Sequence, residues 1–229
     1  MTSVEDVLEA LYAQHNEVYR IQLARFDIPN DHALGIKIPA LRAMAKFLRK
    51  EDNRHELAKA LWNQKEHEAK LLATMIADEH KMTTSDMDAW TNDLYSWDLC
   101  DQLCSNLYKK IPFRLEQANK YIRSEQEFVI RCGIVIMIQD VVHNKKLEEQ
   151  NIEQFLKLGL ALVCNKYTMV KKGLSWLYRQ IGKSNKKNYW LCMEYLQKIN
   201  EHTCPQAQWI YKDAMSELNK KFELNKIKD

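Results

Sequence analysis

The sequence predicts an all-α protein, and three observations support this fold class. Apolar residues recur at the spacing of amphipathic helices along most of the chain. The 229 residues include only five glycines and four prolines, fewer turn-forming residues than a strand-rich fold needs. Hydrophobic residues make up 46% and charged residues 28%, which is enough apolar material for a packed core. We therefore expect one helical domain over residues 1–229.

Apolar periodicity and capping residues predict about a dozen helices of roughly 10 to 18 residues each. The first begins at Thr2, with Glu5 at capping-box spacing. The later helices are Ala40–Lys50, Arg54–Asn63, Lys65–His80, Ser85–Leu94, Asp98–Lys109, Phe113–Arg123, Glu127–His143, Ile152–Val163, Thr168–Gly182, Lys187–Asn200 and Gln206–Phe222. Short connections favour antiparallel neighbours, and helix pairs of about 35 to 45 residues match the period of HEAT-like helical repeat solenoids.

The cysteines and the hydropathy pattern limit the compartment and the cofactors. No CxxC pair and no signal peptide accompany the six cysteines, so we expect free thiols in a reducing, cytoplasmic compartment. Cys100 and Cys104 are four residues apart, but no histidine stands nearby at ligand spacing, and we expect neither a metal nor another cofactor. No apolar run reaches the about 18 residues of a membrane-spanning helix, so we expect no membrane partner. The six cysteines are Cys100, Cys104, Cys132, Cys164, Cys192 and Cys204.

One segment of the chain is strongly basic. From Gln154 to Met193 there is no Asp or Glu, although the whole chain holds 31 acidic residues among 229. The cations of this segment are Lys157, Lys166, Lys171, Lys172, Arg179, Lys183, Lys186 and Lys187. Such a segment predicts a basic surface, for which a polyanion is the expected partner.

The helix predicted within this segment has two distinct faces. An apolar stripe with spacing 4, 3, 4 predicts its core side, at Val170, Leu174, Leu177 and Ile181. The opposite side repeats the same spacing with Lys172, Trp176, Arg179 and Lys183. Either Trp176 is simply covered by the stems of neighbouring cations, or this face contacts phosphates and offers an aromatic surface to a sugar or base.

A second combination of aromatic and charged residues is Trp97 with Asp101, which share a helix face at i,i+4 spacing. One interpretation is structural: Asp98 caps the helix and Asp101 occupies its first turn, where carboxylates are favourable. The functional interpretation places a carboxylate beside an aromatic wall, as a reaction that builds positive charge on a sugar ring requires.

Arg131 is the only charged residue between Glu127 and Asp140 in a helix that is otherwise apolar on most sides. It must either pair internally, with Glu127 as the local candidate, or emerge at a surface that needs a fixed guanidinium. Motifs of other chemistries are absent: the sequence has no HExxH, P-loop, GxGxxG or GxSxG pattern. Nucleotide hydrolysis and acyl transfer therefore have no support.

Three of these segments resemble motifs of the AlkD-like DNA alkylation repair family. Residues 34–42, LGIKIPALR, are similar to its LGIxxPxxR motif, and residues 97–101, WDLCD, to its WDxxD motif. Residues 170–183, VKKGLSWLYRQIGK, are similar to its VKKAxxWxLRxxGK motif, with Gly173 in place of an Ala. Phe26 stands where the family often has a Tyr. The similarity extends over nearly the whole chain.

The resemblance implies a role for each matching residue. Asp101 corresponds to the catalytic carboxylate, Trp97 and Trp176 to aromatic walls of the cleft, and Arg131 to an arginine that grips the DNA backbone. It also implies a HEAT-like solenoid with a concave basic face. We expect contacts to DNA from Arg42, Lys171, Lys172, Arg179, Lys183, Lys186 and Lys187.

The implied function is that of a DNA glycosylase that excises positively charged N3- or N7-alkylated purines, such as 3-methyladenine and 7-methylguanine, from double-stranded DNA. In this family the lesion is expected to stay largely stacked, without base flipping. We expect a monomer without a cofactor or an obligate protein partner. Two alternatives are a HEAT-repeat protein that binds damaged or branched DNA without catalysis, and a protein-interaction scaffold, for which the acid-free basic segment is less suited.

Overall fold

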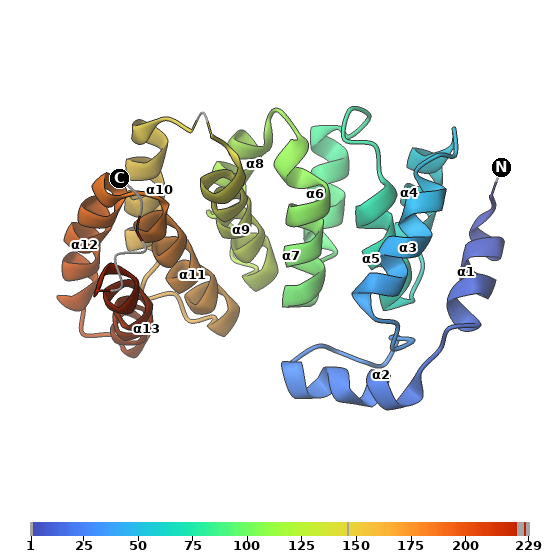
Figure 1. Ribbon diagram of the computed structural model, residues 1–229, viewed down its shortest axis with the longest axis horizontal. Coiled ribbons are helices and arrows are strands. Elements are labelled where there is room, and N and C mark those ends of the chain that lie inside the picture. Colours follow the sequence, from blue (N-terminus) through green and yellow to red (C-terminus); the bar gives the residue numbers. More distant parts are fainter. Residues whose placement is uncertain (1, 146, 224–226, 228–229) are drawn as a thin grey trace. The chain divides into compact units, whose positions relative to one another are not determined.

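A computed structural model of the protein describes residues 2–145, 147–223 and 227, and this part of the chain contains α-helices and short 3-10 helices but no strand (Figure 1). The all-α prediction is confirmed. The described helices are α1 (Val4–Tyr12), α2 (Glu17–Leu23), α3 (Ile38–Leu48), α4 (Arg54–Trp62), α5 (His67–Ile76), α6 (Thr84–Asn92), α7 (Trp97–Asn106), α8 (Arg114–Tyr121), α9 (Glu127–His143), α10 (Glu149–Ala161), α11 (Thr168–Ser184), α12 (Lys186–Asn200) and α13 (Pro205–Glu223). Among the described residues, none of the helices has both the length and the apolar character of a membrane span.

The chain divides into two compact units, residues 1–112 and 113–229. The first contains α1 to α7, and the second contains α8 to α13 (Figure 1). In the first unit, α5 packs against α3, α4 and α7, and every one of its residues is buried. In the second unit, α11 takes the corresponding central position, in contact with α9, α12 and α13. Each unit is thus built around one helix that neighbours cover on several sides.

The first helix begins one residue later than the sequence pattern suggested. Ser3 is its N-cap: the Ser3 Oγ accepts from the Asp6 N–H at 3.1 Å, and the Asp6 carboxylate accepts from the Ser3 N–H at 2.9 Å. The predicted capping box of Thr2 and Glu5 is therefore wrong. The Thr2 N–H instead donates to the carboxylate of Glu51, 49 residues away, which holds Thr2 outside the helix.

Helix α2 was not predicted, because it lacks the buried stripe that marks an amphipathic helix. Val18 and Ile21 are exposed, and only Leu23 is buried. The helix starts at Asn16, whose side-chain oxygen accepts from the Tyr19 N–H at 2.9 Å. It continues into the 3-10 turn Ala24–Phe26. This irregular segment places two aromatic side chains, at positions 19 and 26, beside a pocket.

The segment Leu34–Ile36 is held by a single buried carboxylate. Glu68 is 1% exposed and accepts from the backbone N–H groups of Leu34, Gly35 and Ile36 at 2.7, 2.7 and 3.0 Å. Gly35 has a φ of +76°, and a Cβ there would lie 2.2 Å from the carbonyl oxygen of Asn16. Only glycine fits this position. The turn therefore joins the start of α2 to the centre of the unit.

The apolar stripe predicted in the basic segment is confirmed. Its four side chains are fully buried in α11: Val170, Leu174, Leu177 and Ile181. Burial extends further around the helix than the stripe, to Gly173, Ser175 and Tyr178, because α9, α12 and α13 all pack on α11.

Two of the cysteines differ from expectation. Cys164, after α10, forms a disulfide with Cys204, which directly precedes α13; their Cα atoms lie 5.9 Å apart, within the normal range for a disulfide. The prediction of free thiols is wrong for this pair, because packing brings together two turns that are 40 residues apart. The other four cysteines are buried thiols outside any disulfide, as predicted: Cys100, Cys104, Cys132 and Cys192.

Candidate functional site

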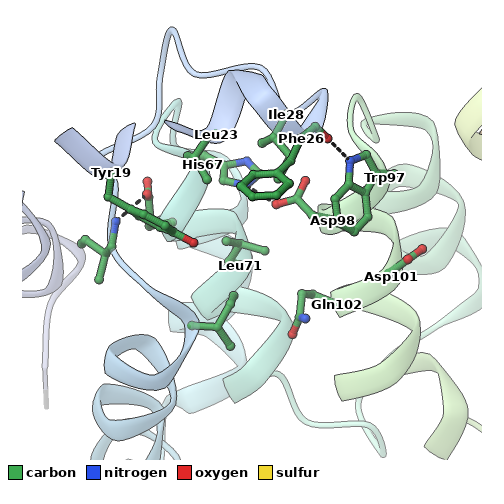
Figure 2. Close-up of a pocket in the computed structure, with 13 residues that line it drawn as sticks. Tyr19, Leu23, Phe26, Ile28, His67, Leu71, Trp97, Asp98, Asp101 and Gln102 are labelled. Carbon is green, nitrogen blue, oxygen red and sulfur yellow. Dashed lines mark hydrogen bonds and ion pairs between the residues drawn. The ribbon is translucent and has the colours of Figure 1, made fainter. Parts of the chain in front are cut away.

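A pocket of about 290 Å³ lies in the first unit, between the α2 segment, the 34–38 turn, α5 and α7. Figure 2 shows its aromatic side chains around the opening and its polar groups along α5 and α7. The lining residues are Tyr19, Leu23, Phe26, Ile28, Ile36, Ile38, His67, Glu68, Leu71, Trp97, Asp98, Asp101 and Gln102. Two residues of the predicted site, Trp97 and Asp101, are among them.

Trp97 is the first residue of α7 and is fixed at both ends of its indole. The Nε1–H donates to the backbone carbonyl of Phe26 at 2.7 Å, as Figure 2 shows. The ring packs against the buried cluster that includes Leu23 and Ile28. A hydrogen-bonded, half-buried indole presents its remaining surface to the pocket in one orientation.

Asp101 follows Trp97 by one helical turn and is half-buried on the same side of α7 (Figure 2). Asp101 and Gln102 both line the pocket. The i,i+4 spacing recognised in the sequence thus places Trp97 and Asp101 on the wall of one pocket. The catalytic role expected of Asp101 remains a prediction.

Asp98 has a different role in the structure from the one predicted. The N-cap of α7 is Ser96, so the prediction that Asp98 is the helix cap is wrong. Its carboxylate accepts from the Nε2–H of the buried His67 at 2.8 Å. An ionised carboxylate has no proton to donate, so the proton in this bond belongs to His67. The other ring nitrogen of His67 lies 2.7 Å from the hydroxyl of Tyr95.

This chain of three side chains keeps Asp98 charged. Burial opposes the charge, but the hydrogen bond and the charge interaction with His67 outweigh it, so the pKa of Asp98 lies below its ordinary value. Burial also raises the pKa of Tyr95, whose hydroxyl therefore stays protonated. A carboxylate of lowered pKa stabilises the fold above its unfolded pKa, and this contribution is lost as the pH falls through its folded pKa.

We expect Asp98→Asn to lower the free energy of unfolding at pH 7 by about 2 kcal/mol, the usual order for a hydrogen bond to a buried charged group. The difference from the wild type should shrink as the pH falls below about 4, the ordinary pKa of an unfolded Asp. Urea unfolding at pH 7 and pH 3 measures both effects, with the exposed Asp52→Asn as control. An Asp98→Asn protein as stable as the control at pH 7 would contradict the pairing.

Arg131 is buried in the second unit, where it helps to fix the start of α11. Its Nη1 donates to the backbone carbonyl of Met169 at 2.9 Å, and the carboxylate of Glu127 accepts from the Met169 N–H at 2.8 Å. The two candidates named from sequence, Glu127 and Arg131, therefore bind the N–H and the C=O of the same residue, Met169. The expected grip of Arg131 on a DNA backbone remains a prediction.

Trp176 lies on α11 away from the apolar stripe and is half-buried. With the Gln180 amide turned so that its oxygen faces the surrounding donors, this oxygen accepts from the Trp176 Nε1–H at 2.9 Å and from the Lys183 Nζ at 3.3 Å. The Trp176 indole is thus hydrogen-bonded to a residue one turn further along the same helix. Its expected role as a cleft wall stays a prediction.

Several cations of the basic segment have acidic partners from other helices. Glu217 of α13 accepts from Arg179 Nη1 at 2.8 Å and from Lys183 Nζ at 2.5 Å, and Asp213 lies 3.7 Å from Arg179 Nε. Burial opposes the charge of Glu217, but these cations outweigh it, so its pKa lies below the ordinary value. Residues 154–193 contain no acid, but acidic side chains of other helices lie beside their cations.

The remaining cations expected to contact DNA lie in varied surroundings. Lys187 pairs with Glu149 at 2.5 Å, and Lys171 Nζ lies 4.6 Å from the ring centre of Trp209. Lys172 is exposed on α11. In the first unit, Arg42 is exposed on α3.

Replacing Glu217 by Gln should strengthen binding to duplex DNA several-fold and steepen its salt dependence. The amide keeps the shape of the side chain but releases two cations for phosphates, and each added phosphate contact raises the salt slope by about 0.9. Fluorescence anisotropy at several salt concentrations measures both quantities. The control is Glu194→Gln, which removes an exposed carboxylate from α12. Equal effects of the two substitutions would show that this face of α11 does not contact DNA.

Sequence reasoning missed three polar groups of the first unit. His67, Glu68 and Tyr95 bond to partners 31, 34 and 28 residues away. The local signal was the occurrence of His and Glu at the start of a helix whose remaining residues are mostly apolar, and that pattern does not identify a partner.

The chain has the all-helical, HEAT-like fold of a helical repeat protein. A solved structure described as "A new family of proteins related to the HEAT-like repeat DNA glycosylases with affinity for branched DNA structures" is similar with a TM-score of 0.82 and 17% identity, over 99% of this chain and 96% of that chain. A designed armadillo repeat protein is similar with a TM-score of 0.39 and 14% identity, over 79% and 92% of the two chains.

The family follows from the sequence. The model of a family described as DNA alkylation repair enzyme matches residues 7–218, and the chain belongs to this family. No curated protein sequence gives a match.

Proposed function

We propose that the protein is a DNA glycosylase that removes N3- and N7-alkylated purines from duplex DNA. The observation that carries this proposal is the pairing of Trp97 and Asp101 on one wall of the pocket, in a chain that belongs to the DNA alkylation repair family. The expected substrates are 3-methyladenine and 7-methylguanine in duplex DNA, and no cofactor is needed.

The chemistry suits the groups present. Alkylation at N3 or N7 gives the purine a positive charge, so the electron pair of the breaking glycosidic bond neutralises the base as it leaves. No general acid is required. The sugar becomes an oxocarbenium ion, which a fixed carboxylate such as Asp101 and an aromatic face such as Trp97 stabilise by their charge and quadrupole. Water then adds to the sugar and loses its proton to the solvent.

Each unit carries cations that would contact a DNA backbone. In the second unit these are the exposed Lys172 and the cations beside Glu217, Arg179 and Lys183. In the first unit the exposed Arg42 contributes. Contacts of this kind give affinity without sequence preference, as a repair enzyme that searches all DNA requires.

The test is the release of free base from duplex DNA treated with a methylating agent, followed by chromatography. We expect 7-methylguanine and 3-methyladenine to appear in the presence of the protein faster than by spontaneous loss. Tight binding to the same duplex without base release would contradict the glycosylase proposal.

A second candidate is binding to branched DNA without catalysis. It is favoured by the similar solved structure, which is described as having affinity for branched DNA. Anisotropy with a four-way junction and with a linear duplex of equal length distinguishes the two functions. A strong preference for the junction together with no base release would support this candidate.

A further inference from the structure

Three aromatic side chains of the second unit form a partly exposed cluster between α12 and α13, two helices that pack on each other (Figure 1). Trp190 of α12 is 57% exposed, more than any other of the six tryptophans, and Phe222 of α13 is 39% exposed. The third ring, Tyr189, is buried. Neighbouring exposed rings, unlike a single exposed apolar side chain, indicate a surface that binds a partner.

The rings of this α12–α13 aromatic cluster support one another. Phe222 stacks on Tyr189, with ring centres 4.6 Å apart and planes 10° apart. Trp190 stands nearly at right angles to both, with its ring centre 5.1 Å from that of Tyr189 and 5.5 Å from that of Phe222. At these edge-to-face distances, one face of the indole rests on the edges of the stacked pair and the other points away from them. A supported, exposed aromatic face suits stacking on another flat ring, because little conformational freedom is lost.

Lysines lie at both ends of the cluster. Helix α12 begins with Lys186 and Lys187, four and three residues before Trp190 and therefore on adjoining parts of the helix surface. Lys220 and Lys221 stand at the other end, in the last turn of α13. The rings are thus flanked by positive charge contributed by two helices.

The acids nearby leave this charge open to an anion. Lys187 pairs with Glu149, but both side chains of the pair are about 70% exposed. Exposed ion pairs contribute little, so a phosphate can take the place of the carboxylate. The first acid of α12 is Glu194, one turn beyond Trp190. We therefore expect the negative part of a ligand to lie toward the start of α12.

A ligand that matches both features carries a flat ring and a negative charge. A nucleotide has both, and it must be unpaired, because the faces of paired bases are covered by their neighbours in the duplex. Since the chain belongs to the DNA alkylation repair family, we take the nucleic acid to be DNA.

We propose that the α12–α13 aromatic cluster binds single-stranded DNA, with a base stacked on Trp190 and the adjoining phosphates on the flanking lysines. Such a site directs the protein to gaps, overhangs and branches, where one strand is unpaired. The inference goes beyond the proposed excision of bases from duplex DNA and does not depend on it, because the cluster shares no residue with the pocket beside Trp97.

Fluorescence anisotropy with a labelled oligo-dT strand of about 12 nucleotides, within the usual range of single-strand sites, tests this proposal. The comparison is an abasic strand of equal length, which keeps the phosphates and lacks the bases. We expect oligo-dT to bind about 10-fold more tightly than the abasic strand, as for one stacked base. Trp190→Ala should abolish this difference, and Trp190→Phe should keep most of it.

The matched control is Trp209→Ala. Trp209 of α13 is 37% exposed, but Lys171 Nζ lies 4.6 Å from its ring centre and covers it. Its removal should leave the preference for oligo-dT unchanged. Lys220→Gln should weaken the binding of both strands equally and lower the salt slope by about 0.7, as for one lost phosphate contact on a single strand.

Equal affinity of the wild type for the two strands, or an equal loss in Trp190→Ala and Trp209→Ala, overturns the proposal. Light scattering tests the other occupant, a second copy of the chain: a wild-type dimer that becomes monomeric in Trp190→Ala without losing oligo-dT binding also overturns it. Base release from alkylated duplex DNA is measured with the same proteins. A wild type that prefers oligo-dT through Trp190 but releases no base supports this inference and contradicts the proposed function alone.

Discussion

Asp101→Asn is expected to lower the rate of base excision about 100-fold or more, the usual loss when one preorganised electrostatic group is removed. Asn keeps the size and a hydrogen-bonding oxygen but removes the charge that faces the oxocarbenium ion. Affinity for duplex DNA should be unchanged or higher, because a negative charge near phosphates is gone. Single-turnover release of 7-methylguanine measures the chemical step separately from binding.

The control for this experiment is Asp52→Asn, which removes an exposed carboxylate that does not line the pocket. It should excise at the wild-type rate. If Asp101→Asn also excises at that rate, Asp101 is not the catalytic carboxylate. If both variants excise slowly, the loss of rate comes from a general change in the charge of the protein. The experiment then gives no support to Asp101 as the catalytic carboxylate.

Glu68→Gln should lower the free energy of unfolding by about 3 kcal/mol, because three charge-assisted hydrogen bonds to buried backbone N–H groups are weakened together. The amide nitrogen of Gln would also face these donors. Urea unfolding provides the measurement. The control is Glu56→Gln, whose carboxylate is 62% exposed and pairs with Lys81, and which should change stability by less than about 1 kcal/mol.

The same substitution tests whether the 34–36 turn supports the pocket. If Glu68→Gln unfolds at the same urea concentration as the control, the turn does not depend on this carboxylate. If it is destabilised as expected, base release from alkylated duplex DNA should slow as well, because the turn joins α2, with Tyr19, to the rest of the unit.

The helices with a strong apolar pattern could be predicted from the sequence. Helix α9 begins and ends at the residues predicted, Glu127 and His143, because a long apolar run has only one way to be buried. The stripe of α11 was predicted correctly for the same reason. The short α2 was missed, since its position depends on the Gly35 turn and on Glu68, which the local pattern does not contain.

The candidate site, too, could be predicted from the sequence only in part. Trp97 and Asp101 could be paired from sequence because helix geometry alone brings residues four apart to one face. The task of Asp98 could not be predicted, because its partner His67 lies on another helix. The sequence around Asp98 favoured a capping role, and this prediction was wrong.

Which charged side chains pair between helices could not be predicted from the sequence, because it depends on how the helices pack. Residues 154–193 contain no acid, yet Glu217 reaches Arg179 and Lys183 from 38 and 34 residues away, and Cys164 meets Cys204 across 40 residues. The physical reason is that periodicity determines which residues share a face, whereas the packing of helices determines what that face contacts. Sequence thus determined the helices and the neighbours within each of them, and only the fold decided the partners between helices.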